Sequence, residues 1–320
     1  MENGRRKVLV CGVTGFLGRN IAERLAERED IDVSGVYHLR PSFDNDCIRM
    51  IQADLRVDSE VRRVLEGQEV VIQMAATTSG SKDIVSKPYI HVTDNIVMNA
   101  LIFRAAYEIG VSQVIFPSCS IMYSSSENPL KESDYDPRVG PPKVYVGAGR
   151  MKVYLEQMCE FFSQLGKTKF TAFRHSNVYG PHDKFDLEKS HVFGATITKV
   201  MTASDKVVVW GTGEEGRDLL YVSDVVDFVE RTLEQKTLFE LVNIGAGKNV
   251  AIRDLVQKIV HASGKNLKIE YDTSKPSIKT SLCLDYTLAE QKFGWKPLIS
   301  LDEGIQKTLS WYRENILRRA

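Results

Sequence analysis

Short apolar runs, rich in β-branched residues, recur along the first half of the chain. They are bounded by turn residues and are the length of buried strands, at residues 8–11, 33–37, 50–53, 70–74 and 114–116. The stretches between them have helical periodicity instead. Strands that alternate with helices predict βαβ units and an α/β fold with a doubly wound parallel sheet.

The helical stretches show an apolar face at a spacing of three to four residues. The first face is formed by Ile21, Ala22, Leu25 and Ala26. A second helix is expected from Asp58, read as its N-cap, to a stop at Gly67, and a third over residues 92–107.

The second half is less regular. Residues 124–142 are rich in Ser, Pro, Asp and Gly and predict a loop, followed by a helix over 148–164 and a strand over 169–173. Later segments predict a turn at 211–216, a strand at 241–244 and helices at 252–262 and 300–312. We therefore expect a first domain over residues 1–176, with a return of the chain at about 218–245, and a smaller domain formed mostly by residues 177–320.

Composition narrows the possible partners. The 320 residues include 42 Lys and Arg and 42 Asp and Glu, so the formal net charge is zero, and we expect neither nucleic acid nor a membrane as partner. No apolar run approaches the roughly 20 residues that cross a bilayer, and the first strand begins too early for a signal peptide. The five cysteines are scattered without Cys-x-x-Cys or zinc-ligand spacing. These features predict a cytoplasmic protein without a metal site.

A glycine-rich turn follows the first predicted strand. It has the spacing Gly-x-x-Gly-x-x-Gly and precedes the first helix. Glycines at such a turn permit a tight bend and a close approach of the backbone to a pyrophosphate, and the helix N-terminus supplies N–H groups. The context predicts a Rossmann-type dinucleotide site formed by Gly12, Thr14, Gly15, Phe16, Leu17 and Gly18.

The end of the second predicted strand bears on the choice of dinucleotide. It reads Tyr37-His38-Leu39-Arg40, without the carboxylate that would bind a ribose 2′-hydroxyl. NADP(H) is therefore favoured, with Arg40 and His38 on the 2′-phosphate; if Arg40 is only a solvated loop residue, NAD(H) is possible. Asp54 and Leu55, at the end of the third strand, are expected to frame the adenine.

Several further motifs occur in chain order: Met74-Ala75-Ala76, Ser118-Cys119-Ser120, Arg174 with Asn177-Val178-Tyr179-Gly180-Pro181, and Arg217 with Tyr221-Val222-Ser223-Asp224. With the glycine turn they resemble the extended short-chain dehydrogenase/reductase family of nucleotide-sugar epimerases and dehydratases, over nearly the whole chain. Residues 177–192, 209–213, 272–276 and 294–295 are most similar to its GDP-L-fucose synthase group, which carries out 3,5-epimerisation and 4-reduction.

The resemblance implies roles for individual residues. Ser118 would bond the sugar, and the base for epimerisation would be Cys119 or Ser120, although an inert buried thiol explains Cys119 equally well. His191 matches the second acid/base. The smaller C-terminal domain would bind the substrate nucleotide, and Ala75 and Ala76 would contact the cofactor. The residues expected to bind the substrate are Asn177, His191, Trp210, Arg217 and Lys279.

The family's Tyr-x-x-x-Lys motif is interrupted. Lys152 matches its lysine, which would bind the nicotinamide ribose, but Ala148 stands in place of the tyrosine. Tyr145 lies seven residues before Lys152, instead of the four that the motif requires. The glycines at 147 and 149 would let the chain bend so that Tyr145 reaches the usual place of the tyrosine. Our hypothesis is that Tyr145 and Lys152 form the proton-transfer pair. The rival is that the role is lost or taken by Cys119, Tyr123 or water.

Three functions remain open at this point. The first is hydride transfer from NADPH to C4 of a GDP-linked 4-keto sugar, with possible C3/C5 epimerisation. The second is a redox-neutral nucleotide-sugar epimerase, or a dehydrogenase, with tightly held NAD. The third is a non-catalytic NADP-binding member of the family. The resemblance also implies a homodimer through the helices at 92–107 and 148–164, whose apolar residues core packing would explain as well.

Overall fold

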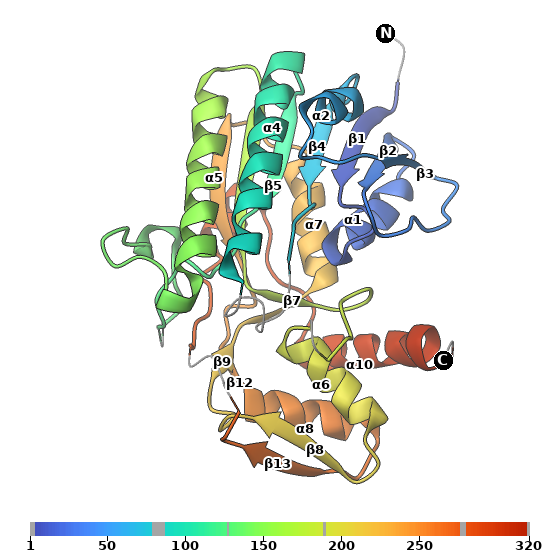
Figure 1. The fold of residues 1–320 in the computed structure, drawn as a ribbon, viewed down its shortest axis with the longest axis vertical. Helices are drawn as coiled ribbons and strands as arrows, with labels where there is room; N and C mark the ends of the chain where they lie inside the picture. Colours follow the sequence, from blue (N-terminus) through green and yellow to red (C-terminus); the bar gives the residue numbers. More distant parts are fainter. Residues whose placement is uncertain (1–3, 79–86, 127, 188–189, 276–279, 319–320) are drawn as a thin grey trace.

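A computed structural model describes residues 4–78, 87–126, 128–187, 190–275 and 280–318 (Figure 1). Its centre is a seven-stranded sheet in the order β11-β6-β5-β4-β1-β2-β3, in which every neighbouring pair is parallel. The strands are β1 (Arg6–Cys11), β2 (Ile31–Tyr37), β3 (Ile48–Gln52), β4 (Val70–Gln73), β5 (Gln113–Pro117), β6 (Lys169–His175) and β11 (Phe239–Ile244). This confirms the predicted doubly wound α/β fold.

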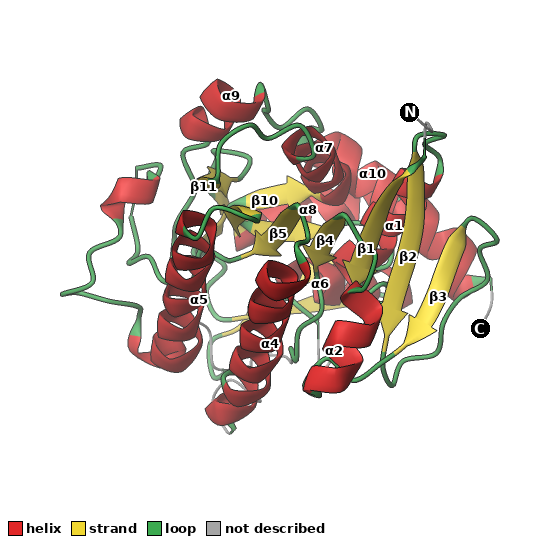
Figure 2. Ribbon diagram, turned by 90° about the horizontal axis from the view of Figure 1, so that it is seen from above, coloured by secondary structure: helices red, strands yellow, loops and turns green. Residues whose placement is uncertain are grey.

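Helices cover both faces of this sheet (Figure 2). One face packs against α2 (Asp58–Leu65), α4 (Thr93–Ile109) and α5 (Val146–Gln164). The other packs against α1 (Phe16–Ala26), α7 (Val222–Thr232) and α9 (Thr287–Phe293). Alternate strand residues enter each layer, so that Ile115 and Phe173 belong to one core and Phe116 and Ala172 to the other.

A smaller lobe lies beyond the carboxyl edge of the sheet, below it in Figure 1. It contains α6 (Val192–Thr202), β8 (Lys206–Trp210), α8 (Ile252–Ser263), β13 (Lys268–Asp272) and α10 (Leu301–Tyr312) around a third apolar core. Within the lobe β8 pairs with β13. Two shorter strand pairs lie outside the main sheet: β7 (Asn177–Tyr179) with β10 (Leu219–Tyr221), and β9 (Gly216–Arg217) with β12 (Val250–Ala251). Short 3-10 turns, at Pro88–His91, Glu132–Asp134 and Lys143–Tyr145, and a final π-helix, Arg313–Leu317, complete the elements.

The C-terminal segment is fixed to the sheet through one buried side chain. Trp295 is fully buried, and its indole N–H donates to the carbonyl of Asp224, 2.8 Å away on α7. The Asp224 carboxylate in turn accepts from the backbone N–H groups of Leu298 and Ile299, at 3.2 Å each. These bonds attach the segment before α10 to a helix of the main sheet.

Most predicted elements are present, with shifted ends. Helix α5 begins at Val146 rather than at 148, and β6 continues to His175, two residues past the expected end. The expected N-cap at Asp58 is wrong, because Val57 holds the cap position and Asp58 is the first helical residue. Helices α6 and α7 were not anticipated; both begin without a side-chain cap bond that the sequence would reveal.

Candidate active site

The glycine turn brings two chain segments into contact at the carboxyl edge of the sheet. Gly12 has φ of +74°, and a Cβ there would lie 2.7 Å from the backbone of Ala75. The Gly15 N–H donates to the Gly12 carbonyl at 2.8 Å and closes the turn. A Cβ on Gly18 would collide with that same carbonyl. The turn therefore requires glycine for both conformation and space, as a pyrophosphate cradle does.

Helix α1 begins at Phe16 directly after this turn, with Gly15 as its N-cap. The N–H groups of the first turn of a helix, here Phe16, Leu17 and Gly18, have no partner within the helix. Together with Thr14 they form the surface on which a phosphate group would fit.

Arg40 lies against the same turn. Its guanidinium donates to the Thr14 carbonyl at 2.8 Å. His38 lies 3.7 Å from a carboxylate oxygen of Asp54, and Arg56 binds that carboxylate at 2.8 Å. The Arg56 hydrogen bonds lower the pKa of Asp54 to about 2. The structure thus brings both predicted 2′-phosphate residues and Asp54 to one end of the dinucleotide site.

The chain after β4 forms the opposite wall of the turn. Ala75 is partly buried against Gly12, and the side chain of Gln73 holds its carbonyl at 3.1 Å. Ala76 is exposed. Leu55, by contrast, is 5% exposed and packs in the core under α2, so its side chain does not reach this surface.

Lys152 extends from α5 to the carboxyl end of β5. Its ammonium donates to the Pro117 carbonyl at 2.7 Å, at the end of β5, and lies 4.7 Å from the Phe116 ring centroid. Burial lowers the pKa of Lys152, and the Cys119 charge opposes that shift. Burial raises the pKa of the Cys119 thiol, and the charge of Lys152 opposes that shift.

Tyr145 lies at the N-terminus of α5, in the N-cap position. Burial raises its pKa, while the charge of Arg217 opposes the shift and that of Cys119 adds to it. Its hydroxyl has no hydrogen-bond partner among the residues described. Cys119, which follows β5, therefore interacts electrostatically with both Tyr145 and Lys152, which belong to the first two turns of α5.

Ser118 does not join this group. It is fully buried, and its hydroxyl donates to the carboxylate of Glu156. Glu156 forms a buried ion pair with Arg174 at 2.7 Å. Arg174 also donates to the Tyr123 hydroxyl at 2.7 Å, and Tyr123 donates to the side chain of Asn243 at 2.9 Å.

This hydrogen-bond network holds residues 118–123, the segment after β5, against the interior of the domain. Tyr123 is 1% exposed and its hydroxyl is held between Arg174 and Asn243, so it is not free to give a proton to a ligand; burial raises its pKa to about 12. Ser120 is 8% exposed and lies on the same short segment. Cys119 is the most accessible of the three residues Ser118, Cys119 and Ser120.

Two histidines lie beside these groups. His191 forms the N-cap of α6, and desolvation together with the Lys184 charge lowers its pKa. His175 ends β6, and its ring interacts electrostatically with both Lys152 and His191. The sequence motifs drew attention to His191 but not to His175. The only local signal for His175 is its position two residues before Asn177, where a strand ends.

The substrate side of the site is formed by short strands. Asn177 on β7 donates from its side chain to the Asp218 carbonyl at 3.2 Å. Arg217 on β9 donates to the carbonyls of Gly216, at 2.7 Å, and Thr280. Burial lowers the pKa of Arg217, and the Tyr145 hydroxyl opposes that shift. Lys279, also expected here, lies outside the described residues.

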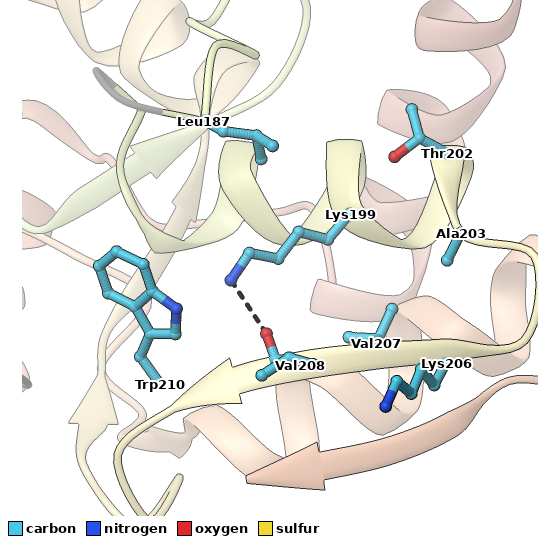
Figure 3. Close-up of a pocket in the computed structure, with 8 residues that line it drawn as sticks. All are labelled: Leu187, Lys199, Thr202, Ala203, Lys206, Val207, Val208 and Trp210. Atoms are coloured by element: carbon cyan, nitrogen blue, oxygen red, sulfur yellow. Dashed lines mark hydrogen bonds between the residues drawn. The ribbon is translucent and has the colours of Figure 1, made fainter. Parts of the chain in front are cut away.

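A pocket opens beside Trp210, at the end of β8 (Figure 3). Its volume is about 310 Å³, and its lining includes Leu187, Lys199 and Trp210. The Lys199 ammonium donates to the Val208 carbonyl at 2.9 Å and lies 5.2 Å from the Trp210 ring centroid. Trp210 is 50% exposed, so part of its ring is accessible for stacking.

Two features of the described residues bear on membranes and metals. Within the described ranges, no helix combines the length and the apolar character needed to span a membrane. Over the same residues, no group of three or more His, Cys, Asp or Glu side chains is placed to hold a metal ion.

Comparison with known proteins gives a consistent picture. The model of the NAD dependent epimerase/dehydratase family matches residues 8–245. The putative GDP-L-fucose synthase 2 of Arabidopsis thaliana is 28% identical over 98% of this chain and 93% of that protein. The GDP-mannose 3,5-epimerase 1 of Oryza sativa subsp. japonica is 25% identical over 97% of this chain and 82% of its own length.

A solved structure resembles the chain over almost its whole length. The UDP-glucose 4-epimerase of Thermotoga maritima, determined with UDP-glucose, superposes with a TM-score of 0.86 at 26% identity and covers 97% of this chain and 99% of that one. The names of these relatives specify different nucleotides: GDP for the synthase and the 3,5-epimerase, and UDP for the 4-epimerase.

Proposed function

The chain belongs to the NAD dependent epimerase/dehydratase family, and from this premise we propose that it reduces C4 of a GDP-linked 4-keto sugar with NADPH. At the coarser level, it is an NAD(P)-dependent enzyme related to nucleotide-sugar epimerases and synthases. The observation that carries the finer proposal is the convergence of Tyr145, Lys152, Cys119 and Arg217 at the carboxyl edge of the sheet.

The cofactor end supports NADPH. No carboxylate follows β2 where one would bind the 2′-hydroxyl, and the Arg40 guanidinium lies 2.8 Å from the glycine turn. A planar guanidinium binds a phosphate group through paired, charge-assisted hydrogen bonds. When bound, the reduced nicotinamide supplies the hydride, and Lys152 would hold the ribose beside it.

The reaction also needs a proton at the sugar oxygen. The hydride would add to C4 as the C=O π electrons move to oxygen, and the new alkoxide would take the Tyr145 proton. Because burial raises the pKa of Tyr145, its phenol stays protonated until the oxygen becomes basic. Arg217 lowers the cost of the phenolate that remains, and solvent would restore the proton.

The pocket beside Trp210 supports a nucleotide substrate. We propose that the base stacks on the Trp210 ring and that the Lys199 ammonium donates to a carbonyl oxygen of the base, such as O6 of guanine. Arg217 and Asn177 would then face the diphosphate. The resemblance of residues 177–192 and 209–213 to GDP-L-fucose synthases favours guanine over uracil.

One observation favours a second candidate. Ala148 lacks the phenol that the family uses for hydride chemistry, whereas Cys119 and His191 remain available for proton transfer next to a carbonyl. A redox-neutral epimerase with tightly held NAD would use that pair. Its mark would be oxidised dinucleotide that stays with the purified protein.

The test is oxidation of NADPH with GDP-4-keto-6-deoxymannose, followed by the loss of absorbance of the reduced nicotinamide. Consumption with stoichiometric formation of a 4-hydroxy sugar supports the reductase. No consumption by folded protein that binds NADPH rejects it, and recovery of bound NAD together with isomerisation of a GDP- or UDP-sugar would establish the second candidate.

We further propose a homodimer through α4 and α5, which lie side by side on one face of the sheet (Figure 2). The outer side of α5 carries an exposed apolar stripe of Tyr154, Phe161 and Leu165, which are 54%, 56% and 42% exposed. Residues seven and four apart share a helix face, so the stripe is continuous. The same stripe cannot be explained by core packing, because it faces away from the sheet.

A further inference from the structure

His175 is placed among the reacting groups by strand register. Pro117 on β5 pairs with Phe173 on β6, and the Ser118 N–H continues this ladder to the Phe173 carbonyl at 2.7 Å. Two residues beyond each partner lie Cys119 and His175. Both residues lie at the carboxyl ends of neighbouring strands, where ligands bind in open parallel sheets.

The tautomer of the ring follows from its one hydrogen bond. The Nδ1 atom lies 2.7 Å from the Ser176 carbonyl. Because a carbonyl oxygen only accepts, Nδ1 must carry the proton, and Nε2 of the neutral ring is an unprotonated acceptor. Among the residues described, Nε2 has no hydrogen-bond partner.

The surroundings keep the ring neutral. Burial lowers the pKa of His175 to about 4, with a further lowering by the charges of Lys152 and His191. The ring is partly buried and packs 6.3 Å from the Phe173 ring centroid, which fixes its plane. At neutral pH it therefore presents a fixed lone pair and no charge.

Three neighbouring side chains do not supply this acceptor. Ala148, one turn before Lys152, ends in a methyl group, and the hydroxyls of Ser118 and Tyr123 are used in the buried network. We propose that His175 Nε2 accepts a hydrogen bond from an O–H or N–H group of the ligand bound at the carboxyl edge of the sheet, and so orients that ligand beside Lys152. The inference rests on the proposed function only in taking the ligand to be a nicotinamide dinucleotide or a nucleotide sugar.

Two donors have the required chemistry: the carboxamide N–H of the nicotinamide and a hydroxyl of the sugar. The first would engage His175 when the dinucleotide binds alone. The second would engage it only when the nucleotide sugar is also present.

The deciding experiment is NMR of the full-length protein with ¹⁵N-labelled histidine, in which ring nitrogens report their protonation and hydrogen bonding. His175→Phe assigns the signal. We expect an Nδ1-protonated ring whose Nε2 resonance moves on saturation with NADPH, or on further addition of GDP-mannose, and these two arms identify the donor. An Nε2 resonance that neither ligand moves, or a ring protonated at Nε2, overturns the proposal.

Variants provide the second readout. His175→Gln retains an acceptor near the Nε2 position, while His175→Phe keeps the ring shape without one. We expect about tenfold weaker binding of the identified ligand by His175→Phe and near-normal binding by His175→Gln. Equal affinity of both variants and the wild type contradicts the proposal. Because binding is measured without turnover, the comparison of affinities remains interpretable even if the protein is not a reductase.

Discussion

Arg40 is the residue on which the choice of dinucleotide depends. We expect Arg40→Ala to weaken NADPH binding about 10- to 30-fold and to leave NADH binding within about twofold, since only NADPH carries the 2′-phosphate. The measurement is titration of reduced-nicotinamide fluorescence. Arg49→Ala, an exposed arginine on β3, is the control. Equal losses for both dinucleotides would refute the assignment.

Tyr145 is the residue on which the chemical step depends. We expect Tyr145→Phe to lower kcat for NADPH oxidation by about 100-fold or more, without changing the Kd for NADPH, because it removes only the proton donor. Steady-state kinetics and fluorescence titration separate these two effects.

Tyr154→Phe is the matched control, since Tyr154 lies on the same helix but is exposed. Adding Ala148→Tyr to Tyr145→Phe restores the four-residue spacing to Lys152 and is expected to recover activity. Retention of full activity by Tyr145→Phe alone would transfer the role to Cys119 or to water.

At this scale, the sequence predicted local chemistry better than side-chain direction. The glycine turn was predictable because steric demands at Gly12 and Gly18 are local. The burial of Ser118 was not, because it depends on Glu156, 38 residues away. His175 was missed for the same reason, since its neighbours come from three other elements.

The segment between β7 and α6 contains a buried carboxyl group. One oxygen of Asp183 accepts from the Lys184 N–H at 2.7 Å, while the other is buried without a hydrogen-bond partner among the described residues. Burial raises the pKa of Asp183 to about 7. The folded state therefore holds a proton that the unfolded state releases near pH 4, and stability falls as pH rises through 4 to 7.

We expect Asp183→Asn to abolish the fall in stability that ionisation of Asp183 causes between pH 4 and pH 7. The variant should gain on the order of 2 kcal/mol in the free energy of unfolding at pH 8 relative to the wild type, and little at pH 4. Urea denaturation at several pH values measures the difference. Asp205→Asn, at an exposed aspartate, should show no such pH dependence, and a gain for Asp183→Asn that is equal at both pH values would contradict the explanation.

The elements of the main sheet were predictable, and those of the small lobe were less so. Buried parallel strands contain continuous apolar runs, such as Val70-Val71-Ile72 in β4, and are evident from the sequence. The two-residue strands β9 and β12 are too short to show a period, and they exist only through pairing with each other. The sequence motif therefore identified Arg217 as a candidate site residue, but the hydrophobic pattern could not predict the strand on which it lies.

For the whole molecule, the exposed stripe on α5 leads to a prediction about assembly. Phe161→Glu places a charge in the centre of the stripe and is expected to convert a dimer into a monomer, because burying an unpaired charge is costly. Light scattering after size-exclusion chromatography measures the mass. Glu160→Gln, at the neighbouring residue, is the control, and a wild-type monomer or a dimeric Phe161→Glu variant would exclude this interface.

The general architecture followed from the alternation of strands and helices, but the order of the strands in the sheet did not. Residues 177–235 build part of the small lobe and then α7, before β11 joins the main sheet. Such crossings are set by long-range pairing, here Phe239 with Phe170 through Ile244 with His175. Periodicity carries no information about which strand lies beside which.

The edge position of β11 has a consequence for the chain while it is being synthesised. Strand β6 has five buried residues in succession, and β11 pairs with it on the side away from β5. The ribosome finishes β6 first and must add residues 176–238 before β11 begins to emerge. During that interval β6 is an open apolar edge, the kind of surface that recruits other strands. We expect the nascent protein to be prone to aggregation during that interval, and a fragment that stops at residue 176 would keep the unpaired edge.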